Sequence, residues 1–328
     1  MSTKLMLHII DLVFSAAMFS FIVGSALAQQ YPSRPITLVV PFAAGTGADI
    51  TGRAIAPTLG EFLGQSMVVD NRGGGGGSIG AKMVAKARPD GYTILLASIS
   101  FSVIPSLMKL EFDPVKDFEP VTMVGIQPYV LVVPPLLPVN SIKELIALAR
   151  SKPGQLNYAT SGIGGLGHLQ WEMIKKERNI DIVHIPRKGT SEALTDILAG
   201  RVQILLTPLP TGLPQIKAGR VKALGVTGDK RALQLPDVPT VYDAGFPSLN
   251  DSVWYAILVP AGTPKEIVTQ INAAFVKTLL KPDAIERLAR AATEPKSSTP
   301  EESATFIKAQ VAKWAKVIND AGIRIDVF

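Results

Sequence analysis

The stretch that decides the fold is ITLVVPFAAGTGADITGRAIAPTLGEFL, residues 36–63. Its apolar start, 36–41, predicts a buried strand, and ADITGRAIAPTLGEFL predicts a helix. Between them lies a tight loop in which Gly45 and Gly47 precede a helix start near Asp49. In open α/β sheets, ligands bind beyond the carboxyl ends of strands, where helix N-termini present unbonded amides. The same residues would also suit a plain turn with Asp49 as the helix cap, so spacing leaves both roles open.

Beyond this stretch, short apolar runs alternate with helix-length amphipathic runs. MVVD and YTILLAS predict two strands that flank a helix. After a proline-rich crossing at 129–140, the runs LNYAT, IVHIP, VQILLTP and VKALGVT predict further strands with helices between them, and VWYAILVP (253–260) predicts a last long one. Ser141, Thr263 and Thr299 each precede a glutamate by three residues, the spacing of a helix capping box.

This alternation predicts an α/β fold in which mostly parallel sheets are flanked by helices. A chain of 328 residues is also too long for one small core, which favours two lobes. We expect the second lobe to be inserted into the first. The expected boundaries are a signal peptide at 1–28, lobe 1 at 29–128 and 255–328, lobe 2 at 129–254, and hinge crossings near 126–134 and 250–258.

The N-terminus predicts export. It combines Lys4, an apolar stretch and the small-residue site Ala26-Leu27-Ala28, which is the layout of a cleavable secretory signal with cleavage after Ala28. A retained membrane anchor is the alternative, but the apolar stretch is short for a full span. The chain has no cysteine, which excludes disulfides, thiolate metal sites and catalytic thiols. An exported protein of this size without disulfides suits the bacterial periplasm.

The glycine run NRGGGGGSIGAKMV, residues 71–84, matches G-x-G-x-x-G at positions 75, 77 and 80. A dinucleotide fold also needs an acidic residue at the end of the next strand, and that strand ends LLASIS. A phosphate loop needs Gly-Lys-Ser/Thr, which the run lacks. We therefore predict a strand-to-helix turn whose amides face a cleft, and we expect no cofactor.

A second glycine loop, NYATSGIGGLGHL at 157–169, repeats the order strand, loop, helix. Ser161 offers a hydroxyl, and Gly162 and Gly164 allow close approach of a ligand to the backbone. Two such loops that face each other across a hinge would bind one small anion from both sides. The formal net charge of +6 fits an anionic ligand. Its scattered basic residues give no sign of a nucleic-acid partner.

Enzyme signatures are missing from the sequence. Only two histidines, His168 and His184, follow the predicted cleavage site, and there is no G-x-S-x-G elbow, no H-E-x-x-H and no cluster with metal-ligand spacing. We interpret His184 as a strand histidine with a satisfied hydrogen bond and His168 as a structural helix-start residue, with a ligand contact of His168 as the alternative. Trp171 and Trp314 are expected in the core.

Seven segments in order give the chain a family resemblance: YPSRPITLVVPFAAGTGAD, VVDNRGGGGGSIGA, ARPDGYTILLAS, HIPRKGTSEALTDILAGRV, LPQIKAGRVKALGVT, LPDVPTVYDAGFP and WYAILVPAGTP. Together they resemble the tripartite tricarboxylate transporter substrate-binding family, also called the Bug family of extracytoplasmic solute receptors. The resemblance covers the chain from about Tyr31 onward. It implies a two-lobed, type II Venus-flytrap binding protein in the periplasm, without catalysis, that binds a small organic acid and serves the permease subunits of a tripartite transporter.

The resemblance also implies that one ligand carboxylate lies between the two glycine loops, with bridging waters. The candidate ligand-binding residues are Phe42, Ala43, Gly45, Thr46, Asp49, Ser98, Ser161, Gly162, Gly164, Arg187, Lys188, Gly189 and Thr207. Four departures from the family pattern bear on the ligand. The first loop reads GTGAD at residues 45–49, where Gly-Gly-Pro-Thr-Asp is usual. Ile163 replaces a common asparagine, Arg187 a common aromatic, and Thr207 a common acid or amide. We interpret Arg187 as a second cationic contact that favours a dicarboxylate or another bulkier anion.

The function predicted from the sequence is therefore a monomeric periplasmic receptor for a small carboxylate. Three alternatives stay open at this point. The receptor could feed a signalling system instead of a permease, the chain could be an exported hydrolase, or it could be an interaction module without a small ligand.

Overall fold

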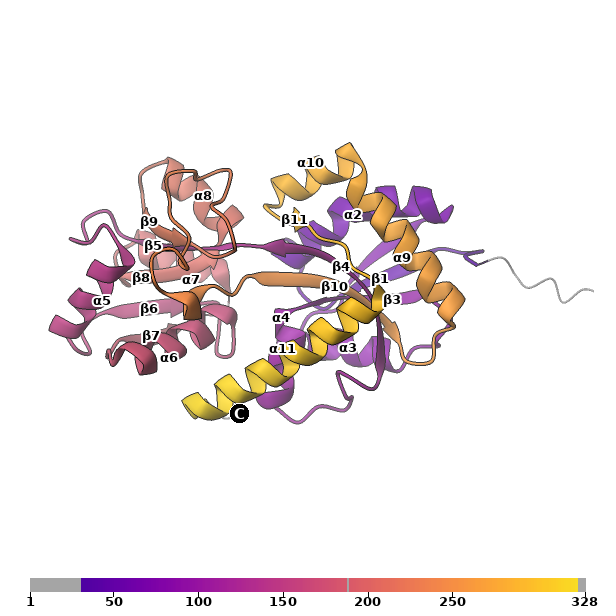
Figure 1. Ribbon diagram of the computed structural model, residues 1–328, viewed down its shortest axis with the longest axis horizontal. Helices are drawn as coiled ribbons and strands as arrows, with labels where there is room; N and C mark the ends of the chain where they lie inside the picture. The colour runs from indigo at the N-terminus through magenta and orange to yellow at the C-terminus, as the bar shows by residue number, and fades with distance from the viewer. Residues whose placement is uncertain (1–30, 188, 324–328) are drawn as a thin grey trace, which may run out of the picture.

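The computed structural model describes residues 31–187 and 189–323, and Figure 1 shows two lobes side by side, each built on a sheet with helices packed around it. The predicted signal peptide and Lys188 lie outside the described residues. The two-lobed α/β architecture is confirmed. In both lobes the strands fall on the apolar runs of the sequence, because burial on both faces removes the need for polar alternation.

The first sheet has the strand order β11-β4-β10-β3-β1-β2. β1 pairs in parallel with β2 and β3, whereas β10 runs antiparallel to β3 and β4. The sheet therefore contains both parallel and antiparallel pairs. Its long strands β4 and β10 connect to the other lobe. The strands are β1 (Ile36–Val40), β2 (Met67–Asn71), β3 (Thr93–Ser98), β4 (Phe118–Gln127), β10 (Val253–Pro260) and β11 (Glu294–Pro295).

The second sheet has the order β7-β6-β8-β5-β9. β6 is parallel to β7 and β8, and β5 is antiparallel to β8 and β9. This sheet repeats the plan of the first, with a parallel part and an antiparallel part. The strands are β5 (Tyr129–Val133), β6 (Asn157–Thr160), β7 (Val183–Pro186), β8 (Ile204–Pro208) and β9 (Lys222–Val226).

Helices follow most strands in both lobes and cover the sheets (Figure 1). Those of the first lobe are α2 (Gly47–Leu63), α3 (Ser78–Ala85), α4 (Ile99–Val103), α9 (Lys265–Leu280), α10 (Pro282–Arg290) and α11 (Pro300–Ala321). Those of the second are α5 (Ile142–Ser151), α6 (Leu166–Arg178), α7 (Thr190–Leu198) and α8 (Leu209–Lys217). Short 3₁₀ turns are η1 (Gly75–Gly77), η2 (Ile104–Ser106) and η3 (Pro247–Leu249).

Strand direction places the carboxyl ends of the parallel strands between the lobes. β10 leaves the second lobe and runs into the first, so β3 and β1, which oppose its direction, end facing the second lobe. β5 runs from the first lobe into the second, and Tyr129 at its start pairs with Pro208 at the end of β8. β8 and its parallel neighbour β6 therefore end facing the first lobe. The loops after β1 and β6 both lie at this inter-lobe edge.

Apolar packing joins the lobes as well as filling them. Trp314 of α11 is fully buried in the first lobe, and Trp171 of α6 is fully buried in the second, as predicted. Leu166 and Leu169 of α6 belong to the core of the first lobe, since α11 packs against α6. The chain crosses between the sheets at β4–β5 and at the start of β10, where Trp254 packs edge-on against Phe306.

Candidate functional site

The first loop, residues 41–46, follows β1 and turns directly into α2. Thr46 caps the helix: its hydroxyl accepts the amide proton of Asp49 at 3.5 Å and donates to the carbonyl of Ala43 at 2.8 Å. Gly45 has a φ of 80°, a left-handed conformation that favours glycine. Ala43 and Gly45 are exposed, so the loop presents its backbone at the inter-lobe edge.

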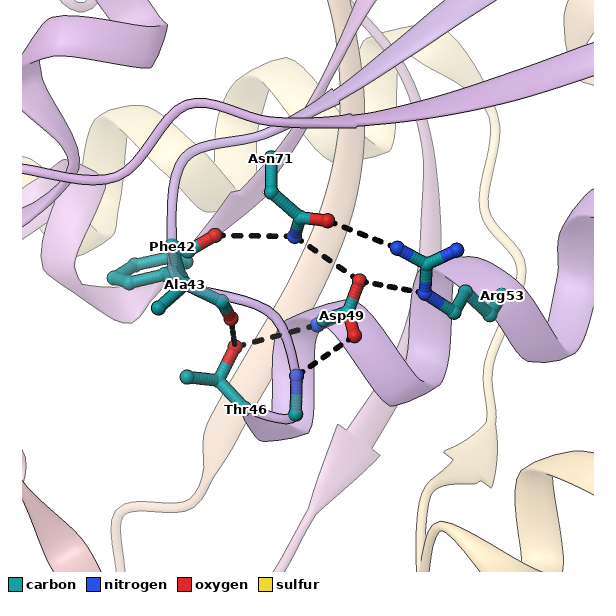
Figure 2. A network of polar contacts seen from close by, with 7 residues as sticks. Phe42, Ala43, Thr46, Asp49, Arg53 and Asn71 are labelled. Carbon is teal, nitrogen blue, oxygen red and sulfur yellow. Dashed lines mark hydrogen bonds and ion pairs between the residues drawn. The ribbon is translucent and has the colours of Figure 1, made fainter.

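The carboxylate of Asp49 holds this loop together (Figure 2). It accepts hydrogen bonds from the amide of Gly45 at 2.8 Å, from Nε of Arg53 at 2.9 Å and from Nδ2 of Asn71 at 3.0 Å. Asn71 also donates to the carbonyl of Phe42 at 3.1 Å. Burial acts to raise the pKa of Asp49, but these hydrogen bonds and the charge of Arg53 outweigh it and lower the pKa below the ordinary value.

Asp49 is therefore committed to donors of its own lobe, and both its oxygens point into the loop. Thr46 thus caps α2, and Asp49 fixes the turn of Gly45. Arg53 and Asn71 complete the network, and sequence reasoning missed both. The i, i+4 spacing of Asp49 and Arg53 on one helix was the available signal.

The glycine run packs beneath the first loop. A Cβ added at Gly73 would lie 3.2 Å from the amide nitrogen of Ala43, and one at Gly80 would lie 2.9 Å from Cα of Pro41. Gly77 has a φ of 102° and lies against the ring of Phe42. Close packing against the backbone thus accounts for glycine at positions 73 and 80. Ser98, at the end of β3, bonds to Ser100 at 3.2 Å and lines a small hollow beside this run.

The second loop, residues 161–165, connects β6 to α6. Gly162 and Gly164 have φ values of 134° and 77°, which require glycine. The amide of Gly164 donates to Nδ1 of His168 at 3.1 Å. Ser161 is exposed and lines a small pocket of the second lobe with Thr190, the first residue of α7.

Arg187 follows β7 next to this loop, where its amide donates to the carbonyl of Thr160 at 3.1 Å. Its Nε donates to Oδ2 of Asp196, a buried carboxylate that also accepts Nη1 of Arg201 at 3.2 Å. Among the described residues, no acceptor bonds to Nη1 or Nη2 of Arg187. One buried aspartate thus orients the guanidinium while leaving its two terminal nitrogens available.

The remaining predicted residues are Lys188, Gly189 and Thr207. Gly189 is the N-cap of α7 in extended backbone, beside Lys188, which lies outside the described residues. Thr207 is fully buried in β8, its hydroxyl has no hydrogen-bond partner in the described part of the chain, and its methyl group faces Gly212 of α8. Thr207 is thus packed between β8 and α8.

The backbone amides divide into two sets. Those of Gly45, Gly162 and Gly164 donate within the loops. Among the described residues, unbonded amides lie in the first turns of the two helices, where no side chain caps α6, and also in the loops, at Ala43, Ala44, Ser161 and Ile163. Within the described ranges, no acceptor bonds to the amides of Gly47, Ala48, Leu166 and Gly167. Glycines thus shape both loops, and the loops and the helix starts both carry amides without an acceptor among the described residues.

The chain matches the model of the tripartite tricarboxylate transporter family receptor over residues 51–323. Protein BugT of Bordetella pertussis is 34% identical over 304 residues, which cover 91% of this chain and 92% of BugT. The chain belongs to the tripartite tricarboxylate transporter receptor family. The family predicted from the sequence is confirmed.

Solved structures of relatives agree with the fold of this receptor chain. Rpa4515 of R. palustris, solved with adipate, is 36% identical with a TM-score of 0.80, and the match covers 90% of this chain and 100% of Rpa4515. MatC of Rhodopseudomonas palustris, solved with bound malate, is 29% identical with a TM-score of 0.75, covering 88% of this chain and 100% of MatC. Both of those proteins were thus solved with a dicarboxylate.

No helix among the described residues combines the length and the apolar character that a membrane crossing requires. The described residues also contain no group of three or more histidine, aspartate or glutamate side chains arranged to bind a metal ion. The relatives of this chain are solute-binding receptors, not enzymes.

Proposed function

We propose that this receptor captures a small organic acid between its two lobes. The observation that carries the proposal is the pair of helix N-termini at the facing edges of the two sheets, each with unbonded first-turn amides. Such amides and the partial positive charge of a helix N-terminus suit a carboxylate. The adipate and malate bound by relatives support this ligand class.

In the first lobe, we assign the exposed backbone of Ala43, beside the start of α2, to one side of the carboxylate, and Thr46 supports it by capping the helix. In the second lobe, Ser161 and Gly189 flank the starts of α6 and α7 and form the other side. Asp49 acts indirectly by fixing the first loop. Phe42, Gly45, Gly162 and Gly164 give the two loops their shape.

Arg187 extends this site to a second carboxylate. Its guanidinium is held by Asp196 beside the second loop, and its terminal nitrogens have no acceptor among the described residues. A planar guanidinium binds carboxylates through two parallel hydrogen bonds. This arrangement favours a dicarboxylate over a monocarboxylate.

The crossings at β4–β5 and at the start of β10 serve as the hinge. A ligand that contacts both lobes binds the closed arrangement more tightly and shifts the population toward it. We propose further that residues 1–28 direct export to the periplasm with cleavage after Ala28, and that the liganded monomer delivers its cargo to the permease subunits of a tripartite transporter.

The test is thermal unfolding of the chain from Gln29 onward against mono-, di- and tricarboxylates, with NAD and ATP as controls. A ligand that binds only the folded state raises the unfolding midpoint, and the rise grows with the logarithm of the ligand concentration above Kd. We expect a saturable rise with dicarboxylates. No rise with any acid, or a rise with NAD alone, would contradict the proposal.

A further inference from the structure

Two imidazole rings lie directly beneath the second loop. His168, in the first turn of α6, and His184, in β7, stack with ring centroids 4.2 Å apart and planes 15° apart. The ring of Tyr158 in β6 stacks on His184 at 4.8 Å. His168 is buried and His184 half-buried. They are the only two histidines in residues 29–328, so any imidazole titration in that part of the chain belongs to them.

Each ring holds a different part of the loop. Nδ1 of His168 accepts the amide proton of Gly164 at 3.1 Å. Nε2 of His184 lies 2.7 Å from the hydroxyl oxygen of Thr160, which in turn accepts the amide proton of Gly162 at 3.3 Å. The two left-handed glycines of the loop are thus both tied to the histidine pair.

The bond to Gly164 specifies the protonation state of His168. Because the Gly164 amide is a donor, Nδ1 must be unprotonated, and the single proton of the neutral ring lies on Nε2. An imidazolium carries N–H donors on both nitrogens. Protonation of His168 would therefore set two donors against each other and break the contact. His184 is different, because its Nε2 can donate to Thr160 in either charge state.

The charged groups around the pair act in opposite directions, because Glu172 favours the protonated rings and Lys175 the neutral ones. On α6, Glu172 accepts the Tyr158 hydroxyl at 2.6 Å and Lys175 Nζ at 2.8 Å, so its charge is compensated. On the side of α11, which packs against α6, Lys313 is paired with Asp251.

Burial lowers the pKa of both histidines. For His168, burial is the main cause, with smaller opposed effects of Glu172 and Lys175. For His184, burial comes first and the neighbouring His168 second, and together they lower the pKa to about 4.

We propose that His168 is a positioning residue for ligand capture: its unprotonated Nδ1 fixes Gly164, which aims the first-turn amides of α6 at the inter-lobe edge, so that ligand affinity requires the neutral imidazole. This inference rests on the proposed function. Leu166 and Gly167, whose amides are unbonded, lie between Gly164 and His168 in the chain, so a shift of Gly164 displaces them directly. Capture is strong at neutral pH and weakens in acid.

The test compares adipate affinity by calorimetry at a series of pH values from 7.5 to 4.5 for the wild-type chain and two variants. His168→Asn keeps an acceptor on Cγ at the place of Nδ1 but does not titrate. His184→Gln keeps an N–H donor toward Thr160 and leaves His168 in place. Adipate itself becomes protonated to the same extent in all three experiments. A difference between the proteins in how affinity changes with pH therefore comes from the protein. The NMR signal of the Gly164 amide is followed over the same pH range.

We expect the wild type and His184→Gln to lose affinity with acid more steeply than His168→Asn, by up to about tenfold for each pH unit below the imidazole pKa. The Gly164 amide signal should titrate together with His168 in the wild type. Parallel pH profiles of wild type and His168→Asn, or a Gly164 signal independent of pH, would overturn the positioning role alone. If the wild type binds no acid at pH 7.5, the proposed function fails and this inference with it. Should His168→Asn fail to fold, the Gly164 titration in the wild type decides.

Discussion

The carboxylate of Asp49 accepts the amide proton of Gly45 across the turn that opens α2, at 2.8 Å. This single bond ties the left-handed residue of the first loop to the helix whose amides we assign to the ligand. The loop therefore has a fixed shape before a ligand arrives. A preorganised loop reduces the ordering cost of binding, which raises affinity.

Asp49→Ala should lower the free energy of unfolding by about 2–3 kcal/mol, because a buried carboxylate with charge-assisted bonds is lost. Asp70→Ala is the matched control, since Asp70 pairs with Arg72 at the surface, where ion pairs contribute about 0–1 kcal/mol. Urea unfolding of both variants checks the difference. Equal losses in the two variants would show that the loop network contributes nothing beyond a surface pair.

The charge on Arg187 can be tested with an internal control. Arg187 and Arg201 both pair with the buried Asp196, so Arg187→Tyr and Arg201→Tyr should lower stability to a similar extent. Only Arg187 adjoins the second loop. We therefore expect Arg187→Tyr alone to weaken dicarboxylate binding relative to monocarboxylate binding by about tenfold, or about 1.4 kcal/mol. Unchanged ligand preference in Arg187→Tyr would remove the second cationic contact from the proposed site.

Stability should decline in acid in a window set by the histidines. The folded pKa values of His168 and His184 lie below the ordinary value of about 6.5, so the unfolded chain takes up protons first as the pH falls. The free energy of unfolding therefore begins to fall as the pH drops below about 6.5. It keeps falling until His184 itself becomes protonated in the folded chain, at about pH 4. The pKa of Asp49 is lowered, so the stability that Asp49 contributes is lost only below its ordinary value of 3.8.

A double variant, His168→Asn with His184→Gln, should therefore show a flatter loss of the free energy of unfolding between pH 6.5 and pH 4.5. Urea titrations at several pH values measure this slope. An identical slope in the variant and the wild type would mean that other groups carry the acid sensitivity.

The sequence was sufficient for features that depend on neighbours along the chain. The strand-loop-helix order around Gly45 and Ser161 predicted both loops, and the structure places them at the inter-lobe edge. At Thr299 the predicted capping box forms completely with Glu302. These features arise from bonds between residues at most four apart, which spacing can show.

Features that depend on tertiary packing were not visible in this way. Thr263 has the same capping spacing as Thr299, but its hydroxyl donates to the carbonyl of Pro260 at 2.7 Å, and α9 begins later, after an extended Pro264. Asn71 joins the first loop from a different strand, 22 residues from Asp49. The amides of Gly45 and Gly164 likewise point to side chains, those of Asp49 and His168. The orientation of these side chains is defined only in the folded chain.

The glycine run offers the clearest test of packing against nucleotide binding. A Cβ at Gly80 would lie 2.8 Å from the carbonyl oxygen of Arg72 and 2.9 Å from Cα of Pro41, so Gly80→Ala must displace backbone at the base of the first loop. We expect a loss of about 1–3 kcal/mol, the usual cost of overpacking, reduced by the higher helix propensity of alanine. Gly189→Ala is the control, because its φ of −179° is extended and a Cβ there meets no atom within 4 Å. Its stability should stay within about 0.5 kcal/mol of the wild type. The measurement is the urea midpoint with and without NAD. If Gly80→Ala keeps wild-type stability but loses an NAD-dependent shift of the midpoint, the result favours a nucleotide loop over the packing role.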